Sequence, residues 1–313
     1  MNDFRIPLGR WVEDIIDFIT DTFGFLFDLV ATVVSGAYEI VDAVFSAPPF
    51  WAIIIVLAVL GFAARGWKFA LGTVIGLTLI VGVDQWDNAM DTLALVLVAS
   101  LIAILIAVPL GIAAAKSRTT SNFVRPILDF TQTMPAFVYL IPALILFGIG
   151  VVPGVVATII FAVAPGVRLT ELGIRGVDSE VVEAGQAFGA SPWRILRQIQ
   201  LPLAMPSIMA GINQVIMLSL SMVVIAGMVG AGGLGQPVVA SLNRIDVALG
   251  FEAGLSVVIL AIFLDRLTAA LGGGETPLGR VLSRRGAARI ERDAAAKSAA
   301  PGQAPVEREL VDA

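Results

Sequence analysis

Few residue types in this chain could do chemistry, because the sequence contains no cysteine and no histidine. Without cysteine there can be no disulfide, no thiolate metal site and no cysteine nucleophile. Without histidine the chain lacks the commonest general base and metal ligand. We therefore expect no catalytic residues and no metal site, and a function that depends on binding rather than on catalysis.

The remaining polar residues are concentrated in a mid-chain insert, residues 168–202, which separates two apolar segments. Its most distinctive part reads EAGQAFGASP from Glu183 and IQLP from Ile199. Charges at these positions would not be accepted inside a bilayer. A folded polar insert in an apolar chain is typical of a site that binds a soluble partner, and an ordinary polar loop is the alternative.

Local residue types predict a pair of short helices in the insert. The stretch from Asp178 to Phe188 favours a helix, and Gly189 ends it because glycine tolerates the left-handed backbone of a helix end. Ser191-Pro192 then starts a second helix, since serine is a good N-cap and proline suits the first turn. Leu201-Pro202 is expected to end this second helix and return the chain to the membrane.

The elements that position the insert are apolar. Of 313 residues, 58% are hydrophobic and 14% are charged, whereas soluble domains carry about 25% charged residues. The composition therefore predicts an all-α membrane protein. Since a span needs about 20 residues, we expect about seven transmembrane helices, with the first pair short, near residues 50–64, 69–83, 92–115, 133–150, 151–167, 203–229 and 247–264.

An amphipathic helix is expected before these spans, over residues 11–45. Apolar residues recur there at helical spacing, while Asp14, Asp17 and Asp21 fall on the other side. We interpret this helix as too polar to span, lying along the membrane surface or packing against the bundle. The predicted organisation is an N-terminal external or interfacial segment (1–49), two additional spans with an external loop (50–91), a membrane core (92–271) and a largely disordered cytoplasmic tail (272–313).

The distribution of positive charge predicts the orientation. If the insert is cytoplasmic, every lysine and arginine except Arg5, Arg10 and Arg244 falls on the cytoplasmic side. Positive residues are enriched in cytoplasmic loops. We therefore expect a multi-pass protein of the cell membrane with its N-terminus outside and its C-terminus in the cytoplasm.

The insert resembles a known family. The spacing Glu-Ala-Ala-x3-Gly-x9-Ile-x-Leu-Pro marks the membrane subunits of binding-protein-dependent ABC importers. The matching positions here are Glu183, Ala184, Gly185, Gly189, Ile199, Leu201 and Pro202, and Gly185 departs from the second alanine. The resemblance implies a type I ABC importer permease core in which these residues, with Ser191 and Pro192, form coupling helices that dock on an ATPase subunit.

Two further stretches are similar to permeases of glycine betaine/proline betaine importers. One reads DFTQTMPAFVYLIP from Asp129, and the other, here called the Gly turn, is GAGGLG at residues 230–235. The Gly turn also fits G-x-G-x-x-G, but it follows a span rather than a strand, so we do not expect it to bind a dinucleotide. The gate or pathway candidates in these stretches are Gln132, Met134, Pro135, Phe137, Tyr139, Gly230, Gly232, Gly233 and Gly235.

The resemblance also implies a function and a set of partners. The function is import of glycine betaine or a related compatible solute by a transport subunit that is not itself an enzyme. The implied partners are ATPase subunits that carry ATP and Mg²⁺, a separate external binding protein, a second copy of this chain and the lipid bilayer, with no cofactor in this chain and no nucleic acid. The alternatives are a permease for another small solute (an amino acid, choline or carnitine), an ion-coupled secondary transporter and a non-transporting membrane scaffold.

Overall fold

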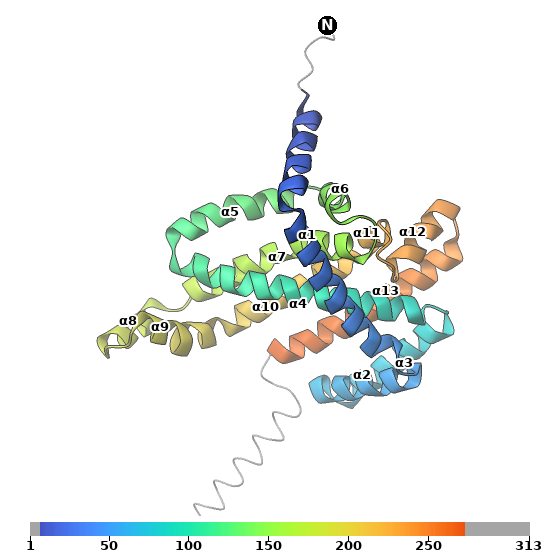
Figure 1. Cartoon of the computed structure of the whole chain (residues 1–313). Coiled ribbons are helices and arrows are strands. Elements are labelled where there is room, and N and C mark those ends of the chain that lie inside the picture. The colour runs from blue at the N-terminus through green and yellow to red at the C-terminus, as the bar shows by residue number, and fades with distance from the viewer. Residues whose placement is uncertain (1–6, 273–313) are drawn as a thin grey trace, which may run out of the picture.

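The computed structural model describes residues 7–272, and every regular element within them is helical (Figure 1). Before the core come α1 (Leu8–Ser46), α2 (Phe50–Arg65) and α3 (Trp67–Gly82). The core and insert comprise α4 (Trp86–Lys116), α5 (Arg118–Thr133), α6 (Ala136–Phe147), α7 (Val151–Arg175), α8 (Ser179–Ala187), α9 (Pro192–Ile195) and the π-helical turn η1 (Leu196–Gln200). The last helices are α10 (Leu201–Ser221), α11 (Val223–Gly227), α12 (Gly235–Arg244) and α13 (Val247–Gly272). All but the first residue of the predicted tail lies outside the described residues.

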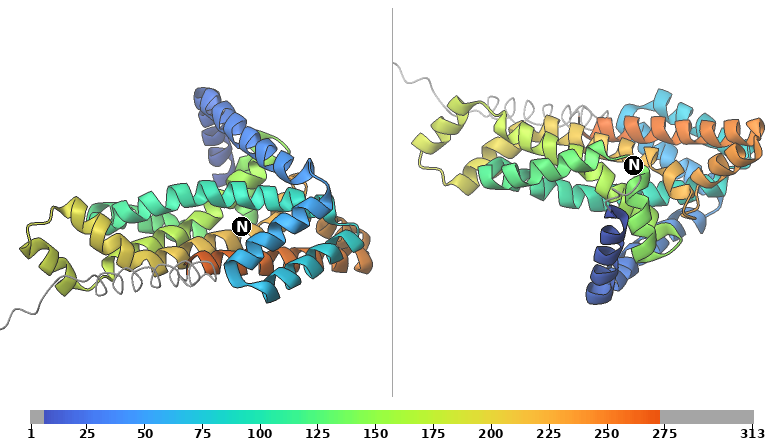
Figure 2. Two further views of the ribbon diagram at one scale, coloured as in Figure 1. Left: turned by 90° about the horizontal axis from the view of Figure 1, so that it is seen from below. Right: turned by 90° about the horizontal axis from the view of Figure 1, so that it is seen from above.

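Helices α4, α7 and α10 lie side by side, and α13 packs on α10 (Figures 1 and 2). Small residues bring their backbones close together. A Cβ at Gly166 of α7 would lie 2.7 Å from Cβ of Ala107 in α4 and 2.9 Å from Cγ2 of Val215 in α10. The hydrophobic effect does not drive helices together in lipid, because the lipid tails are themselves apolar. Close van der Waals packing of this kind instead stabilises the association of membrane helices.

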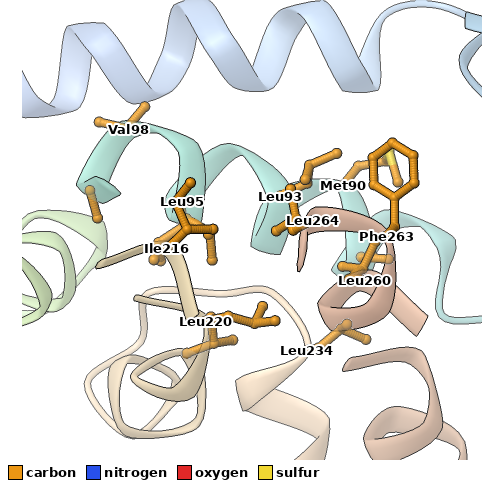
Figure 3. Packing of buried hydrophobic residues seen from close by; sticks show 14 of the residues in the cluster. Met90, Leu93, Leu95, Val98, Ile216, Leu220, Leu234, Leu260, Phe263 and Leu264 are labelled. Atoms are coloured by element: carbon orange, nitrogen blue, oxygen red, sulfur yellow. The ribbon is translucent and has the colours of Figure 1, made fainter. Parts of the chain in front are cut away.

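The main apolar core lies where α4, α10 and α13 meet. Leu95 of α4, Leu220 of α10 and Leu260 of α13 are all buried in it, and the Gly turn contributes Leu234 (Figure 3). On the outer surface of α4, Leu101 and Leu105 are exposed, as expected for side chains that face lipid. This core fixes the long helices whose ends position the insert and the Gly turn.

The number of spans differs from the sequence-based expectation. Five helices are long and apolar enough to cross a membrane among the described residues, or six if the bent pair α5 and α6 counts as one. The first predicted pair corresponds to α2 and α3, which have 16 residues each. At 1.5 Å per residue each is about 24 Å long, shorter than a hydrocarbon core of about 30 Å. The all-helical membrane fold itself is confirmed.

The N-terminal helix corrects one expectation and confirms another. The backbone of α1 is non-helical at Phe23, and Asp14, Asp17 and Asp21 all precede that kink. The helix contains a window apolar enough to cross a membrane, with a mean hydropathy of 1.5, so its acids do not exclude a span. Its packing against the bundle is confirmed by the Phe27 ring, which meets Phe147 edge to face at 5.8 Å. The first half of α1 projects away from the bundle (Figure 1).

The span predicted at residues 133–150 is also corrected. The chain there bends by 100° between α5 and α6. Pro135 disfavours a helical conformation at the preceding residue, and Met134 is extended, with φ −76° and ψ 137°. The predicted span is therefore the second half of a broken element whose first half is α5.

Candidate functional site

The first helix of the insert begins and ends where its residues predict. Asp178 caps α8 by accepting a hydrogen bond from the backbone nitrogen of Glu180 (2.9 Å). At the other end Gly189 has φ +76°, and the nitrogen of Ala190 donates to the carbonyl oxygen of Gly185 (3.1 Å). This left-handed turn is the helix end that glycine favours. It reverses the chain toward α9.

The second helix begins as predicted but does not end where expected. Ser191 caps α9 through its hydroxyl, which accepts from the nitrogen of Arg194 (3.4 Å). The chain then passes through η1 directly into α10, so Leu201-Pro202 lies inside a continuous helical run. Proline donates no backbone hydrogen bond, and the π-helical turn just before it changes the bonding register, with Leu201 nitrogen donating to Leu196 oxygen.

The insert is fixed rigidly to the ends of the long helices. Leu196 is 1% exposed and packs in a cluster with Ile174 of α7 and Ala204 of α10. The ammonium group of Lys116, the last residue of α4, lies 5.4 Å from the centre of the Trp193 ring, a cation–π distance. Movement of the insert would therefore be passed directly to α4, α7 and α10.

Gly185 lies where α8 crosses the second helix. A Cβ there would be 2.8 Å from Cδ1 of Ile199 and 3.6 Å from Cγ1 of Ile195. The close contact gives a physical reason for a small residue at this position, where the family pattern has alanine. The neighbouring Ala184 is exposed.

The remaining expected coupling residues form an exposed surface. None of the residues of α8 is buried. Glu183, Ala184, Gly189, Ser191, Pro192 and Pro202 are exposed, while Gly185, Ile199 and Leu201 are partly buried. Beside them Phe188 is 92% exposed and Trp193 is 62% exposed. Phe188 was not among the coupling residues predicted from the sequence, although an aromatic residue between alanine and glycine in a polar stretch is a usable signal.

Several gate candidates gather at the break between α5 and α6. Gln132 donates from Nε2 to the carbonyl oxygen of Phe161 in α7 (2.8 Å). Tyr139 is buried, its hydroxyl donates to the carbonyl oxygen of Thr131, and Met134 packs against its cluster. Pro135 directly precedes α6 and makes the break. By contrast, Phe137 is 51% exposed and does not join this cluster.

The Gly turn is held closely by its neighbours. The backbone nitrogen of Leu234 donates to the hydroxyl of Thr92 in α4 (2.7 Å), and a Cβ at Gly233 would lie 2.6 Å from that hydroxyl oxygen. At its other end, the residue before Gly230 accepts from the nitrogen of Gly150 (2.9 Å). Gly232 faces Asp91 of α4, and Gly235 packs on the backbone of α11. The turn follows α11 rather than a strand and so lacks the dinucleotide-binding context.

A buried carboxylate that sequence reasoning missed joins α5 to α7. Glu171 is 4% exposed, and its Oε1 accepts from Ser121 Oγ (2.7 Å), Arg125 (3.0 Å) and Arg175 (3.0 Å). Its partners on α5 lie 46 and 50 residues away, so no local pattern marks it.

Within residues 7–272, no group of three or more acidic side chains is arranged to hold a metal ion.

The geometry can be compared with known proteins. Residues 107–273 match the family described as binding-protein-dependent transport system inner membrane component. Over 269 residues the chain is 50% identical to the glycine betaine/carnitine transport permease protein GbuB of Listeria monocytogenes serotype 1/2a (strain 10403S), covering 85% of this chain and 95% of GbuB. Over 267 residues it is 48% identical to the glycine betaine/proline betaine transport system permease protein ProW of Escherichia coli (strain K12), covering 85% of this chain and 75% of ProW.

A solved structure shows the same fold. A chain of the MetNI methionine ABC transporter, in inward-facing conformations, superposes with a TM-score of 0.56 at 22% sequence identity, covering 60% of this chain and 94% of that one. Identity this low shows the fold alone. The family match and the relatives together show that the chain belongs to the inner membrane components of binding-protein-dependent transport systems, in which it is a permease component.

Proposed function

We propose that this permease imports glycine betaine or a related compatible solute. The observation that carries the proposal is the 50% identity to a glycine betaine/carnitine permease over 95% of that protein's length. ATP hydrolysis would occur on separate ATPase subunits that hold ATP and Mg²⁺. An external binding protein would deliver the solute, and a second copy of this chain would complete the pathway. Permeases for choline, carnitine or an amino acid are the alternatives.

The insert is the proposed docking site for the ATPase. It projects from one end of the bundle, while α12 lies at the other (Figure 1). Its exposed surface combines Glu183 with the aromatic side chains of Phe188 and Trp193, and buried aromatic anchors dominate the energetics of protein interfaces. Because Leu196 is buried among the long helices, a partner that moves this surface would also move them.

The proposed orientation places the insert and the C-terminus in the cytoplasm and the N-terminus outside. It rests on the lysine and arginine distribution and requires an even number of membrane crossings before α4. The chain has no native cysteine, so single cysteines can test it. Gly9→Cys should react in whole cells with a membrane-impermeant thiol reagent, and Ala190→Cys should not. The reverse pattern would contradict the orientation.

The experiment that tests the function is solute uptake in reconstituted vesicles. The permease, its ATPase and its binding protein are assembled, and accumulation of radiolabelled glycine betaine is measured with choline, carnitine and amino acids as competitors. We expect uptake that requires ATP and survives an uncoupler. Uptake that survives ATP depletion but collapses with an uncoupler would identify an ion-coupled transporter instead. Stronger competition by an amino acid would correct the substrate.

A further inference from the structure

Helix α7 meets its neighbours in two different ways. Against α4 and α10 it packs backbone to backbone through small residues such as Gly166. Helix α5 is different, because only Ser121, Val124 and Leu128 of its 16 residues are buried. Val124 and Leu128 join a small apolar cluster with α4 and α7. The packing of α5 on α7 is therefore thin.

Polar contacts make up much of what holds α5 on α7. Glu171 binds Ser121 and Arg125 at one end. An ion pair between Asp129 and Arg168 follows further along α5. At the far end Gln132 donates to a backbone carbonyl of α7 (2.8 Å). These contacts run along most of the length of α5.

A cavity of about 360 Å³ lies beside these contacts. It is lined by Arg125, Asp129, Arg168, Glu171, Leu172 and Arg175. The polar side chains that join α5 to α7 therefore line a cavity, and the space between the two helices is not filled by other side chains. Regions with few buried apolar contacts and accessible polar ones open at lower free energy than packed cores.

The α5–α6 arm (residues 118–147) begins and ends at breaks in the helical backbone. Ser117, before α5, is extended, with φ −129° and ψ 119°. After α6, Gly148 has φ +73° and Gly150 has φ +141°, conformations that favour glycine. The arm is broken in the middle by the 100° bend. Helix α5 can therefore shift relative to α6 without disrupting either helix.

We propose that α5 moves against α7 during the transport cycle, and that the contacts of Glu171 with Ser121 and Arg125, here called the α5 latch, hold it in the position seen here. This inference rests on the proposed function. The residues of the latch are positioning residues for the arm that carries the gate candidates. The ion pair between Asp129 and Arg168 must also separate when α5 moves.

Glu171 of the latch lies in α7, only a few residues before α8, the first helix of the insert. Arg175, the last residue of α7 and close in the chain to α8, shares the same oxygen of Glu171 with Arg125 (3.0 Å each). Arg175 also donates to the carbonyl oxygen of Ala114 in α4 (2.7 Å). A shift of the insert would displace Arg175 first. The contact between Arg175 and Glu171 would then change, and with it the strength of the contact between Glu171 and Arg125. The insert would thereby release or retain α5.

Cross-linking α5 to α7 tests the movement directly. The double variant Asp129→Cys/Arg168→Cys is assembled with its ATPase and binding protein, and the thiols are joined by a short reagent that dithiothreitol cleaves. Joining is verified by the fragments that a protease leaves. We expect the uncross-linked variant to import glycine betaine, the cross-linked one to lose at least nine-tenths of that uptake, about a tenfold change, and cleavage to restore it. Unchanged uptake after verified cross-linking would overturn the proposal.

A labelling experiment tests the latch without requiring transport. Leu128 of α5 is 4% exposed, so a thiol at Leu128→Cys reacts only when α5 leaves α7. In the assembled complex without ATP, Arg125→Gln or Glu171→Gln should raise the labelling rate about tenfold, as expected for losing hydrogen bonds to a charged group. Arg118→Gln, an exposed arginine on the same helix, is the matched control and should leave the rate unchanged.

The uptake and labelling experiments distinguish a failure of the latch proposal from a failure of the proposed function. Equal labelling in Arg125→Gln, Glu171→Gln and Arg118→Gln would overturn the latch even if ATP-driven uptake is intact. Absence of ATP-driven uptake in the unsubstituted complex, with labelling raised as expected, would instead overturn the proposed function and leave the latch standing.

Discussion

At the residue scale, Gly185 shows how side-chain size limits the approach of two helices. A Cβ there would lie 2.8 Å from Cδ1 of Ile199, the end of a flexible side chain that can turn aside. Alanine also favours a helix over glycine by about 1 kcal/mol. We therefore expect Gly185→Ala to bind the ATPase nearly normally. Gly185→Leu should separate α8 from the second helix and weaken ATPase binding, as measured by pull-down. Gly82→Leu, at an open position of α3 outside the insert, is its control, and equal binding by both leucine variants would contradict this account.

Phe188 gives a second prediction at this scale. Because its side chain is 92% exposed, Phe188→Ala should change the free energy of unfolding by no more than about 0.5 kcal/mol. If the insert docks on the ATPase, the same change should weaken ATPase affinity by about 2 kcal/mol. Thermal unfolding of the permease alone and titration with the ATPase measure the two effects. Unchanged affinity would show that Phe188 does not lie in the interface.

At this scale, the features that could be predicted from the sequence are those set by neighbouring residues in the chain. Gly189 and Ser191-Pro192 mark helix ends through their own backbone preferences, so the end of α8 and the start of α9 could be predicted. Glu171 could not, because its partners on α5 lie 46 and 50 residues away. The position of Gly185 against Ile199 likewise depends on how two helices cross.

At the element scale, breaking the contact between α4 and the Gly turn is expected to lower the free energy of unfolding. Thr92 is fully buried and accepts a hydrogen bond from the nitrogen of Leu234 (2.7 Å). Thr92→Val keeps the side-chain shape but leaves that buried N–H unpaired, which costs about 1–3 kcal/mol. We expect the variant to unfold at a correspondingly lower denaturant concentration.

Thr73 of α3 provides the matched control for this prediction. It is also buried, but its hydroxyl donates to Phe69 of its own helix (2.9 Å). Since the Phe69 carbonyl keeps its helical partner, Thr73→Val should cost less than about 1 kcal/mol. Equal losses in the two valine variants would mean that Thr92 does not hold the Gly turn.

The elements also show where periodicity and hydropathy are insufficient. The apolar run at residues 133–150 reads as one span, but its helix is only the second half of a bent pair. Met134-Pro135 separates this helix, α6, from the first half, α5. The end expected at Leu201-Pro202 is absent because η1 accommodates the proline. Both errors concern how consecutive segments join, which depends on the packing of neighbouring helices as well as on the local sequence.

At the scale of the whole molecule, the arrangement separates a rigid part from a movable one. Helices α4, α7 and α10 are joined by close backbone contacts and carry the insert. Helix α5 is bridged to α7 largely by polar side chains beside a cavity, whereas α6 packs against α7 through buried apolar residues. Composition predicted the membrane fold, but this division could be found only from the contacts.

The division gives a prediction for the rigid part. Gly166→Leu should separate α7 from α4 and α10, because a Cβ alone would already meet Ala107 at 2.7 Å. Overpacking of this kind typically costs about 1–3 kcal/mol. Thermal unfolding in detergent should show the loss, whereas Gly82→Leu, at an α3 position with open space around it, should not. A stable Gly166→Leu variant would contradict the close packing.

The most direct test of the central claim is ATP-driven uptake of glycine betaine by the double variant Glu183→Arg/Gly189→Trp in the assembled transporter. These changes alter the charge and the turn of the exposed insert surface without touching the bundle. The account predicts that the permease remains folded in the membrane, that its ATPase dissociates and that uptake is lost. Uptake and ATPase association equal to those of the unsubstituted protein would contradict the claim that the insert couples ATP to transport.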